Sequence, residues 1–361
     1  MQHFASDNYA PVHPEVLAAI GAANDGPAVA YGDDLVTARL AERVREVFGD
    51  VARAFPVING TGANVISLMA VSPRWGGVVT SDVAHVNNDE NGAPERVGGL
   101  KVLASPSVDG RIGVDALDRW AADAGDVHRA QPVVLSLTQA TELGTVYPLA
   151  DVKLLADAAH AHGMAVHVDG SRLANAAASL GVGLRELTTD VGVDILSLGA
   201  AKNGGMIGEA VVVLSDVVPV ATGSARPADA VPYLRKATMQ LASKARFVSA
   251  QLLALLGEPA SAGDPLWLRN AAHANAMAAR LRAGVEGAGL GDAVRVTRPT
   301  EANAVFATLP RAAADRVRAD YRFYDWATGE TADRVEVRWM CSWDTTETDV
   351  DGFVEAIEKA L

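Results

Sequence analysis

The chain has 361 residues, of which 49% are apolar and 21% are charged, as is usual for a globular protein large enough to form two domains. Its formal net charge of −13 repels phosphate backbones and anionic lipids, so neither nucleic acid nor a membrane surface is expected as a partner. The single cysteine, Cys341, excludes an intramolecular disulfide, and its apolar surroundings favour a position in the core.

The N-terminal part of the chain combines two helices with a glycine-rich turn. Residues 1–7 lack the basic and apolar regions of a signal peptide, and no apolar run is long enough to span a bilayer, so a cytoplasmic location is expected. Helices are predicted over residues 14–22 and 35–48. A short apolar strand over 54–58 then leads through Asn59-Gly-Thr-Gly62 into a helix over 63–71.

The middle of the chain alternates between short apolar strands and amphipathic helices. Strands are predicted over residues 78–80, 132–137, 165–168, 195–198 and 209–214, and helices over 114–122, 149–162 and 173–180. Strands that are apolar throughout and alternate with helices are typical of a mainly parallel sheet covered on both faces. The sequence therefore predicts an α/β domain.

The alternation stops near residue 235. Long helices are predicted over 236–256 and 266–287, followed by strands over 304–309 and 335–340 and a helix over 349–361. We therefore expect a large domain over residues 1–245 and a smaller C-terminal α+β domain over 246–361. The stretch 258–265, rich in Ala, Gly and Pro, is the expected flexible connection.

Two polar residues follow neighbouring strands, at the edge where open α/β sheets bind ligands. Asp169 follows the strand 165–168, and such a carboxylate either needs a buried partner or caps the helix that starts near Arg172. Lys202 lies among small residues between two apolar strands. A confined lysine there is a usable amine nucleophile, whereas the alternative is an exposed lysine in a turn.

A third candidate is the turn Gly60-Thr61-Gly62, where a strand, a glycine-rich turn and a helix start could bind an anion or form a plain turn. It matches neither the dinucleotide motif nor a P-loop. Together, a lysine, a carboxylate and an anion site are what pyridoxal 5′-phosphate (PLP) requires, because it needs an amine for its aldehyde, an acid for its pyridine nitrogen and a phosphate site.

These segments also resemble a known family. The run His167-Val-Asp-Gly-Ser-Arg-Leu-Ala-Asn-Ala176 resembles the H-x-D-G-A-R-x-x-N-A signature of L-threonine aldolases, with Ser171 in place of alanine. The stretch from Asp194 to Gly204 is similar to the lysine segment of the bacterial low-specificity form. The resemblance extends from Ser6 to Asp344. It implies a fold-type-I, aspartate-aminotransferase-like PLP enzyme of the β-eliminating lyase branch.

The resemblance implies a role for each matched position. Lys202 would hold PLP in a Schiff base, Asp169 would face its pyridine nitrogen, and His85 would stack on its ring. The implied ligands of the cofactor phosphate are Gly60, Thr61 and Gly62. Those of the substrate carboxylate are Ser6, Arg172 and Arg338, and Arg172 would contact the cofactor as well. Glu90 would lie near the substrate β-position, and Lys236 would be a further basic residue near the active site.

The implied reaction is cleavage of threonine, allo-threonine and related β-hydroxy-α-amino acids to glycine and an aldehyde, with His85 as first and Glu90 as second candidate for the base. Other PLP chemistry on a small amino acid (β-elimination, transamination or racemisation) stays open, as does a non-catalytic regulator. Family members form sites at a dimer interface, so a homodimer or homotetramer is implied.

Two segments depart from the family pattern, and both concern substrate preference. The stretch Thr138-Gln139-Ala-Thr-Glu142 stands where some aldolases carry a second histidine. The family's C-terminal R-x-x-T-H-x-D appears here as Arg338-Trp-Met-Cys341-Ser342-Trp-Asp344, with Cys341-Ser342 in place of Thr-His.

A metal hydrolase is a further alternative, suggested by His160, His162, His167 and Asp169. Successive helical residues are about 100° apart, so His160 and His162 would point in different directions. We therefore expect no metal site.

Overall fold

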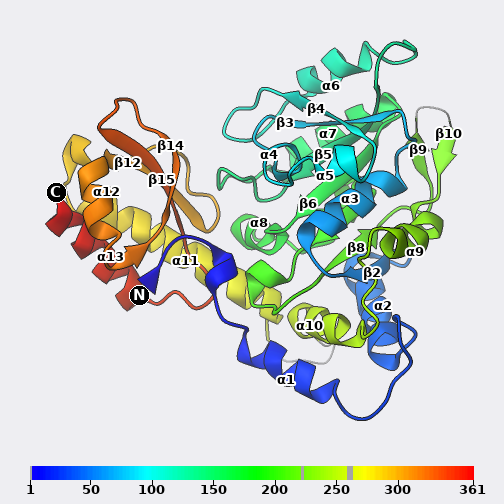
Figure 1. Ribbon diagram of the computed structural model, residues 1–361, viewed down its shortest axis with the longest axis horizontal. Coiled ribbons are helices and arrows are strands. Elements are labelled where there is room, and N and C mark those ends of the chain that lie inside the picture. Colours follow the sequence, from blue (N-terminus) through cyan, green and yellow to red (C-terminus); the bar gives the residue numbers. More distant parts are fainter. Residues whose placement is uncertain (1, 221–222, 258–262) are drawn as a thin grey trace.

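The computed structural model describes residues 2–220, 223–257 and 263–361. Its centre is a seven-stranded sheet in the order β2-β8-β7-β6-β5-β3-β4 (Figure 1). The strands are β2 (Arg53–Val57), β3 (Gly76–Ser81), β4 (Lys101–Ser105), β5 (Gln131–Thr138), β6 (Ala165–Gly170), β7 (Ile195–Leu198) and β8 (Glu209–Val213). Strand β8 runs opposite to the other six, so its pairings with β2 and β7 are antiparallel and the remaining pairings are parallel. The mainly parallel sheet predicted from the sequence is confirmed.

Helices cover both faces of this sheet, which explains why its strands are apolar throughout. One face packs against α3 (Gly60–Ala70) and α9 (Pro227–Ala237). The other packs against α2 (Leu35–Phe48), α6 (Val114–Ala121), α7 (Leu149–Ala161), α8 (Leu173–Leu180) and α10 (Arg246–Leu256). Helix α1 (Pro14–Ala22) lies on α10, and the short helices α4 (His85–Asn88) and α5 (Ala93–Arg96) follow β3.

The single helix predicted over 236–256 is wrong. Helix α9 ends at Ala237, and α10 begins at Arg246. Between them Met239 has a positive φ of 62°, which a helix does not allow. The side chain of Gln240 instead accepts a hydrogen bond from the N–H of Ile58 (2.9 Å), which ties the break to the end of β2.

The smaller domain is a four-stranded antiparallel sheet in the order β11-β12-β15-β14, with three helices against it (Figure 1, yellow to red). Its strands are β11 (Arg295–Val296), β12 (Ala304–Pro310), β14 (Tyr324–Thr328) and β15 (Arg334–Met340), and its helices are α11 (Leu266–Gly287), α12 (Arg311–Val317) and α13 (Glu347–Ala360). Cys341 is buried in this domain's core. The predicted α+β character is confirmed.

Hydrophobic contacts link opposite ends of the chain. Phe4 belongs to the core of the smaller domain, with its ring stacked on Phe353 at 4.3 Å between centroids. Strand β1 (Gln2–His3) pairs with β13 (Tyr321–Arg322). Helix α10 and Trp267 pack instead into the core of the large domain. The boundary at residue 245 stays a prediction, and of the expected connection, residues 258–262 lie outside the described part of the chain.

No helix among the described residues is long and apolar enough to cross a membrane. The remaining short elements are the antiparallel strands β9 (Val218–Val220) and β10 (Gly223–Ala225) and the 3₁₀ turns η1 (Asp7–Tyr9), η2 (Thr189–Val191), η3 (Ala201–Asn203) and η4 (Gly291–Ala293).

Candidate active site

The candidate site lies at the carboxyl edge of the large sheet, where parallel strands end and binding sites usually form. Asp169 is the penultimate residue of β6, and Lys202 lies in η3, after β7. Strand β8 is antiparallel, so its first residue, Glu209, reaches the same edge. A small cavity here is lined by Gly60, Ala63, Asp169, Ser171, Ser197, Leu198, Gly199 and Glu209.

Asp169 is buried and held from two sides. Its Oδ1 accepts a hydrogen bond from the N–H of Ser171 (3.0 Å), and its Oδ2 accepts one from the Asn64 amide (2.8 Å). Burial alone would raise the pKa of Asp169, but the charge of Lys202 and these hydrogen bonds hold it below its ordinary value. Asp169 is therefore an ionised carboxylate, as a protonated pyridine nitrogen requires.

Lys202 has the properties of an amine nucleophile. Burial lowers its pKa below the ordinary lysine value, and the positive charge of Arg172 lowers it further. The side chain of Glu209 accepts a hydrogen bond from the N–H of Ala200 and so fixes the turn that carries Lys202. Burial raises the pKa of Glu209 to about 7.

His85 and Glu90 form a hydrogen-bonded pair. The His85 Nδ1 and Glu90 Oε1 atoms are 2.9 Å apart, and this bond raises the pKa of His85 above its ordinary value. Burial raises the pKa of Glu90 as well, although its hydrogen bonds to His85 and Asn64 oppose that shift. The Glu90 side chain is fully buried, whereas His85 is 38% exposed, so Glu90 lies behind the histidine.

The glycine turn is the first turn of α3, three residues earlier than the helix start predicted from the sequence. Asn59 caps this helix, because its side chain accepts a hydrogen bond from the N–H of Gly62 (2.8 Å). The Gln240 side chain fills the space where a Cβ atom at Gly62 would lie, which explains why this position is glycine. The helix N-terminus offers N–H groups to an anion.

Arg172 and Arg338 come from different domains and have unequal surroundings. Asp7 binds Arg172 through two hydrogen bonds, at 2.7 Å to Nε and 2.9 Å to Nη2. Burial, together with the charge of Arg172, lowers the pKa of Arg338 to about 10. Within the described chain the buried Nε of Arg338 has no hydrogen-bond partner, and its guanidinium lies 4.9 Å from the Trp326 ring centroid. An anion would fit beside these two cations.

Ser6 and Lys236 have different positions relative to this site. Ser6 lies between Ala5, whose carbonyl accepts a bond from Arg338, and Asp7, and its Oγ accepts from the N–H of Asn8. Lys236 is instead exposed on α9, with Nζ 5.1 Å from the centroid of the Tyr31 ring. The structure therefore places Ser6 beside the arginines and Lys236 on the surface.

Several residues of the site were not predicted from the sequence: the buried Asp7, Asn64, Glu142 and Glu209, and the partly buried Gln240. Asn64 follows the glycine turn by two residues, so it could have been found as a polar residue on the buried face of α3. The acids carry no such signal, because a buried Glu and an exposed Glu look alike in a sequence.

The histidines considered for a metal site lie apart and have other partners. His160 is paired with Asp194 (2.8 Å) and His162 with Asp118 (2.9 Å). His167 is buried between the hydroxyls of Ser136 and Ser197, and burial lowers its pKa to about 4. Among the described residues, donor atoms of His85, Glu90 and Asp169 do lie within 4.8 Å of one another. The family resemblance assigns His85 and Asp169 of this group to PLP, and Glu90 to the substrate β-position.

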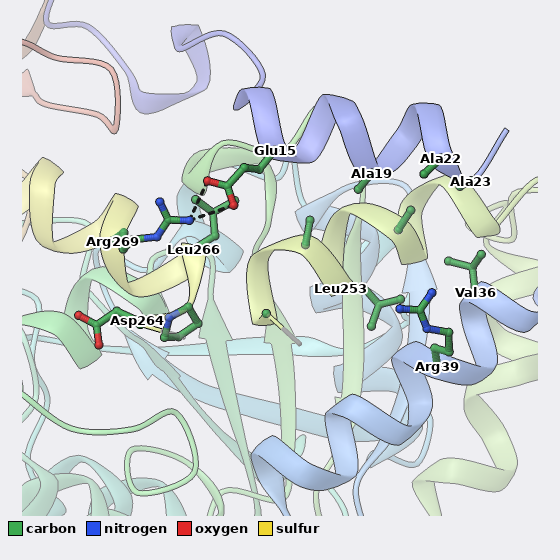
Figure 2. Close-up of a pocket in the computed structure, with 15 residues that line it drawn as sticks. Glu15, Ala19, Ala22, Ala23, Val36, Arg39, Leu253, Asp264, Leu266 and Arg269 are labelled. Carbon is green, nitrogen blue, oxygen red and sulfur yellow. Dashed lines mark hydrogen bonds and ion pairs between the residues drawn. The ribbon is translucent and has the colours of Figure 1, made fainter. Parts of the chain in front are cut away.

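A larger hollow lies elsewhere in the molecule and contains none of the predicted site residues. It has a volume of about 720 Å³ and lies between α1, α2, α10 and the start of α11 (Figure 2). An ion pair between Glu15 and Arg269 (2.7 Å) stands at its rim, and small apolar residues such as Ala19 line it. The described residues that line it include no nucleophile beside an acid, so their chemistry differs from that of the sheet edge.

Comparison with known proteins identifies the family. The family model of the beta-eliminating lyases matches residues 3–310. A low-specificity L-threonine aldolase from a Pseudomonas species is 38% identical over 97% of this chain and 95% of its own, and one from Pseudomonas aeruginosa is 39% identical over 95% and 93%. The solved structure of a Leishmania major threonine aldolase is 26% identical, covers 99% of both chains and superposes with a TM-score of 0.89. The chain therefore belongs to the beta-eliminating lyase family, among the low-specificity L-threonine aldolases.

Proposed function

We propose that this protein is a PLP-dependent carbon–carbon lyase that cleaves L-threonine, L-allo-threonine and related β-hydroxy-α-amino acids to glycine and an aldehyde. The observation that carries the proposal is the pairing of Lys202 and an ionised Asp169 at one sheet edge with a two-arginine anion site, in a chain similar over its length to threonine aldolases.

The residues of the sheet edge fit PLP. The first turn of α3, Gly60 to Gly62, would hold its phosphate through the N–H groups of Gly60 and Thr61, because the N–H of Gly62 donates to Asn59. Asp169 would bind its pyridine nitrogen, and His85 would stack on its ring. Lys202 Nζ, whose lowered pKa favours the neutral amine, would attach covalently to its aldehyde. Bound PLP supplies an electron sink for the electrons of the broken Cα–Cβ bond.

The substrate carboxylate would bind Arg172 and Arg338, with Ser6 beside them. Because that contact fixes one end of the amino acid, it turns the β-hydroxyl toward a base. His85 is the first candidate for the base, and its pair with Glu90 would accommodate the proton that it takes. In this arrangement Glu90 acts through His85.

The direct test is aldehyde release from threonine, allo-threonine and phenylserine by the purified protein. We expect acetaldehyde or benzaldehyde together with glycine, and a loss of about 10³-fold or more in kcat for Lys202→Ala, which removes the nucleophile. Pyruvate and ammonia from serine as the main products would instead assign the site to elimination. A keto acid as the main product would indicate transamination, and a D-amino acid would indicate racemisation. No turnover on the whole panel would favour a regulator.

We further propose that the protein acts in the cytoplasm as a homodimer or homotetramer, with active sites at the dimer interface. Large apolar side chains are exposed near Lys236: Tyr31 (50%), Leu35 (83%), Tyr233 (79%) and Met239 (80%). Such a surface suits contact with a second copy, and it would bring Lys236 toward that copy's site. Light scattering on the purified protein tests the proposal, and a monomer at micromolar concentration would contradict it.

A further inference from the structure

Asn64 lies at the centre of the candidate site, although neither the motif nor the expected reaction gives it a role. It follows the glycine turn by two residues on α3 and is buried, with 2% of its surface exposed. Its Nδ2 donates to Glu90 Oε1 and to Asp169 Oδ2, each at 2.8 Å. The NH₂ group carries two hydrogens, so one amide group can donate to both acids at once.

These contacts connect residues that the reaction assigns to different tasks. Starting from the imidazole, His85 Nδ1 bonds Glu90, Glu90 shares the Asn64 amide with Asp169, and Asp169 faces the place of the pyridine nitrogen. Each of the two amide hydrogens serves one carboxylate. The two acids are thus parts of one hydrogen-bonded row.

The charges around this row explain why it needs the amide. Glu90 and Asp169 are two buried negative groups whose oxygens lie within 4.8 Å of each other, and such a pair tends to retain one proton. His85 and Lys202 supply positive charge from the site, while Glu142 adds negative charge near Asp169. The Asn64 amide is the uncharged donor common to both acids.

We propose that Asn64 is a positioning residue, which holds the Glu90 and Asp169 carboxylates in place with one amide group and so joins His85 to the cofactor acid in a single hydrogen-bonded row. The effect that we expect on PLP binding rests on the proposed function. The effect that we expect on thermal stability concerns the two acids alone and does not depend on PLP.

The test uses Asn64→Leu, which has the same branched shape and no donor, and Asn64→Thr, whose hydroxyl hydrogen can serve only one acid. Asn175→Leu is the matched control, because Asn175 is also a buried amide but bonds Asn275 on α11. Two quantities are measured on the full-length protein: the PLP dissociation constant by absorbance titration, and the thermal midpoint at about pH 5.5 and about pH 8.

We expect Asn64→Leu to weaken PLP binding about tenfold or more, because Asp169 loses a buried partner, and Asn64→Thr to fall between it and the parent. The midpoint lost by Asn64→Leu should be at least about 2 °C greater at the higher pH, since unpaired carboxylates cost more when both are ionised. The control should lose the same amount at both pH values and keep its PLP affinity.

An Asn64→Leu protein that matches the control in both quantities would overturn the proposal. The two failures are distinguishable. If the parent protein binds no PLP, the proposed function fails, and the pH dependence of the midpoint still tests the part that Asn64 has in holding the two acids.

Discussion

Glu142 replaces a local cap for the helix that carries His85. The N-cap residue of α4, Ala84, offers no side-chain hydrogen bond, and Glu142 Oε1 instead accepts from the N–H of His85 (2.7 Å) and from the Thr138 hydroxyl (3.0 Å). Burial, with the charge of Asp169 adding to it, raises the pKa of Glu142 to about 6. One acid from a distant loop thus fixes the backbone of the candidate base.

This raised pKa predicts a pH-dependent gain in stability for Glu142→Gln. A carboxyl whose pKa is higher in the folded protein favours folding below its unfolded value near 4.5, and that contribution is lost as pH rises through about 6. The variant keeps an acceptor for His85 and has no charge to bury. It should therefore gain about 2 kcal/mol in the free energy of unfolding near pH 8 and nothing near pH 4.

Urea unfolding at the two pH values measures the effect, with Glu42→Gln on the exposed side of α2 as the control that should show none. An equal change for Glu142→Gln at both pH values would show that its ionisation does not matter.

At the scale of elements, the 3₁₀ turn Asp7–Tyr9 links three parts of the chain. Asp7 is buried and binds Arg172, which follows β6, and it also accepts a hydrogen bond from Asn303 (3.1 Å), just before β12. The N-terminal segment thereby holds the large sheet and the smaller domain around one carboxylate. Removing that carboxylate would leave Arg172 and Arg338 as neighbouring buried cations.

Asp7→Asn is therefore expected to lower the free energy of unfolding by about 3–5 kcal/mol, because it leaves a buried guanidinium without its anion. The double variant Asp7→Asn with Arg172→Met should be more stable than the sum of the two single losses predicts, because the uncompensated charge is gone. Urea unfolding of all four proteins completes the cycle. Additive losses would mean that the two side chains contribute independently.

The elements themselves were largely predictable. The helix bounds 14–22, 35–48, 173–180 and 266–287 agree with the structure, because apolar periodicity and caps are local properties. The break between α9 and α10 was not, since it depends on Gln240 bonding to β2 across the fold. The motifs predicted Lys202 and Asp169 because a motif is also a local property. Asn64 and Glu142 could not be predicted in this way, because their roles depend on partners that are brought together only by folding.

At the scale of the whole molecule, the proposed substrate carboxylate would lie between the two domains, because Arg172 belongs to the large sheet's edge and Arg338 to β15 of the smaller domain. Helix α11 joins these parts, with reciprocal hydrogen bonds between Asn175 on α8 and Asn275. A bound amino acid would add a further link.

Glycine is accordingly expected to slow hydrogen exchange in residues 5–9 and in β15 of the PLP-loaded protein, because it bridges the two arginines. Ethanolamine, which has an amine and no carboxylate, should leave exchange there unchanged. Mass spectrometry of peptides from both segments measures the difference. Equal protection by the two ligands would place the carboxylate somewhere else.

The contact between Phe4 and Phe353 has a consequence for how the protein is made. A ribosome synthesises Phe4 and Asp7 first, yet their partners in the smaller domain come near the end of the chain. Until then Phe4 has no core to enter, and Arg172 meets Asp7 without the support of Asn303. Contacts so distant in sequence form late. We therefore expect the amino-acid site to be completed only after α13 has left the ribosome, so nascent chains that stop before α13 should have no aldolase activity.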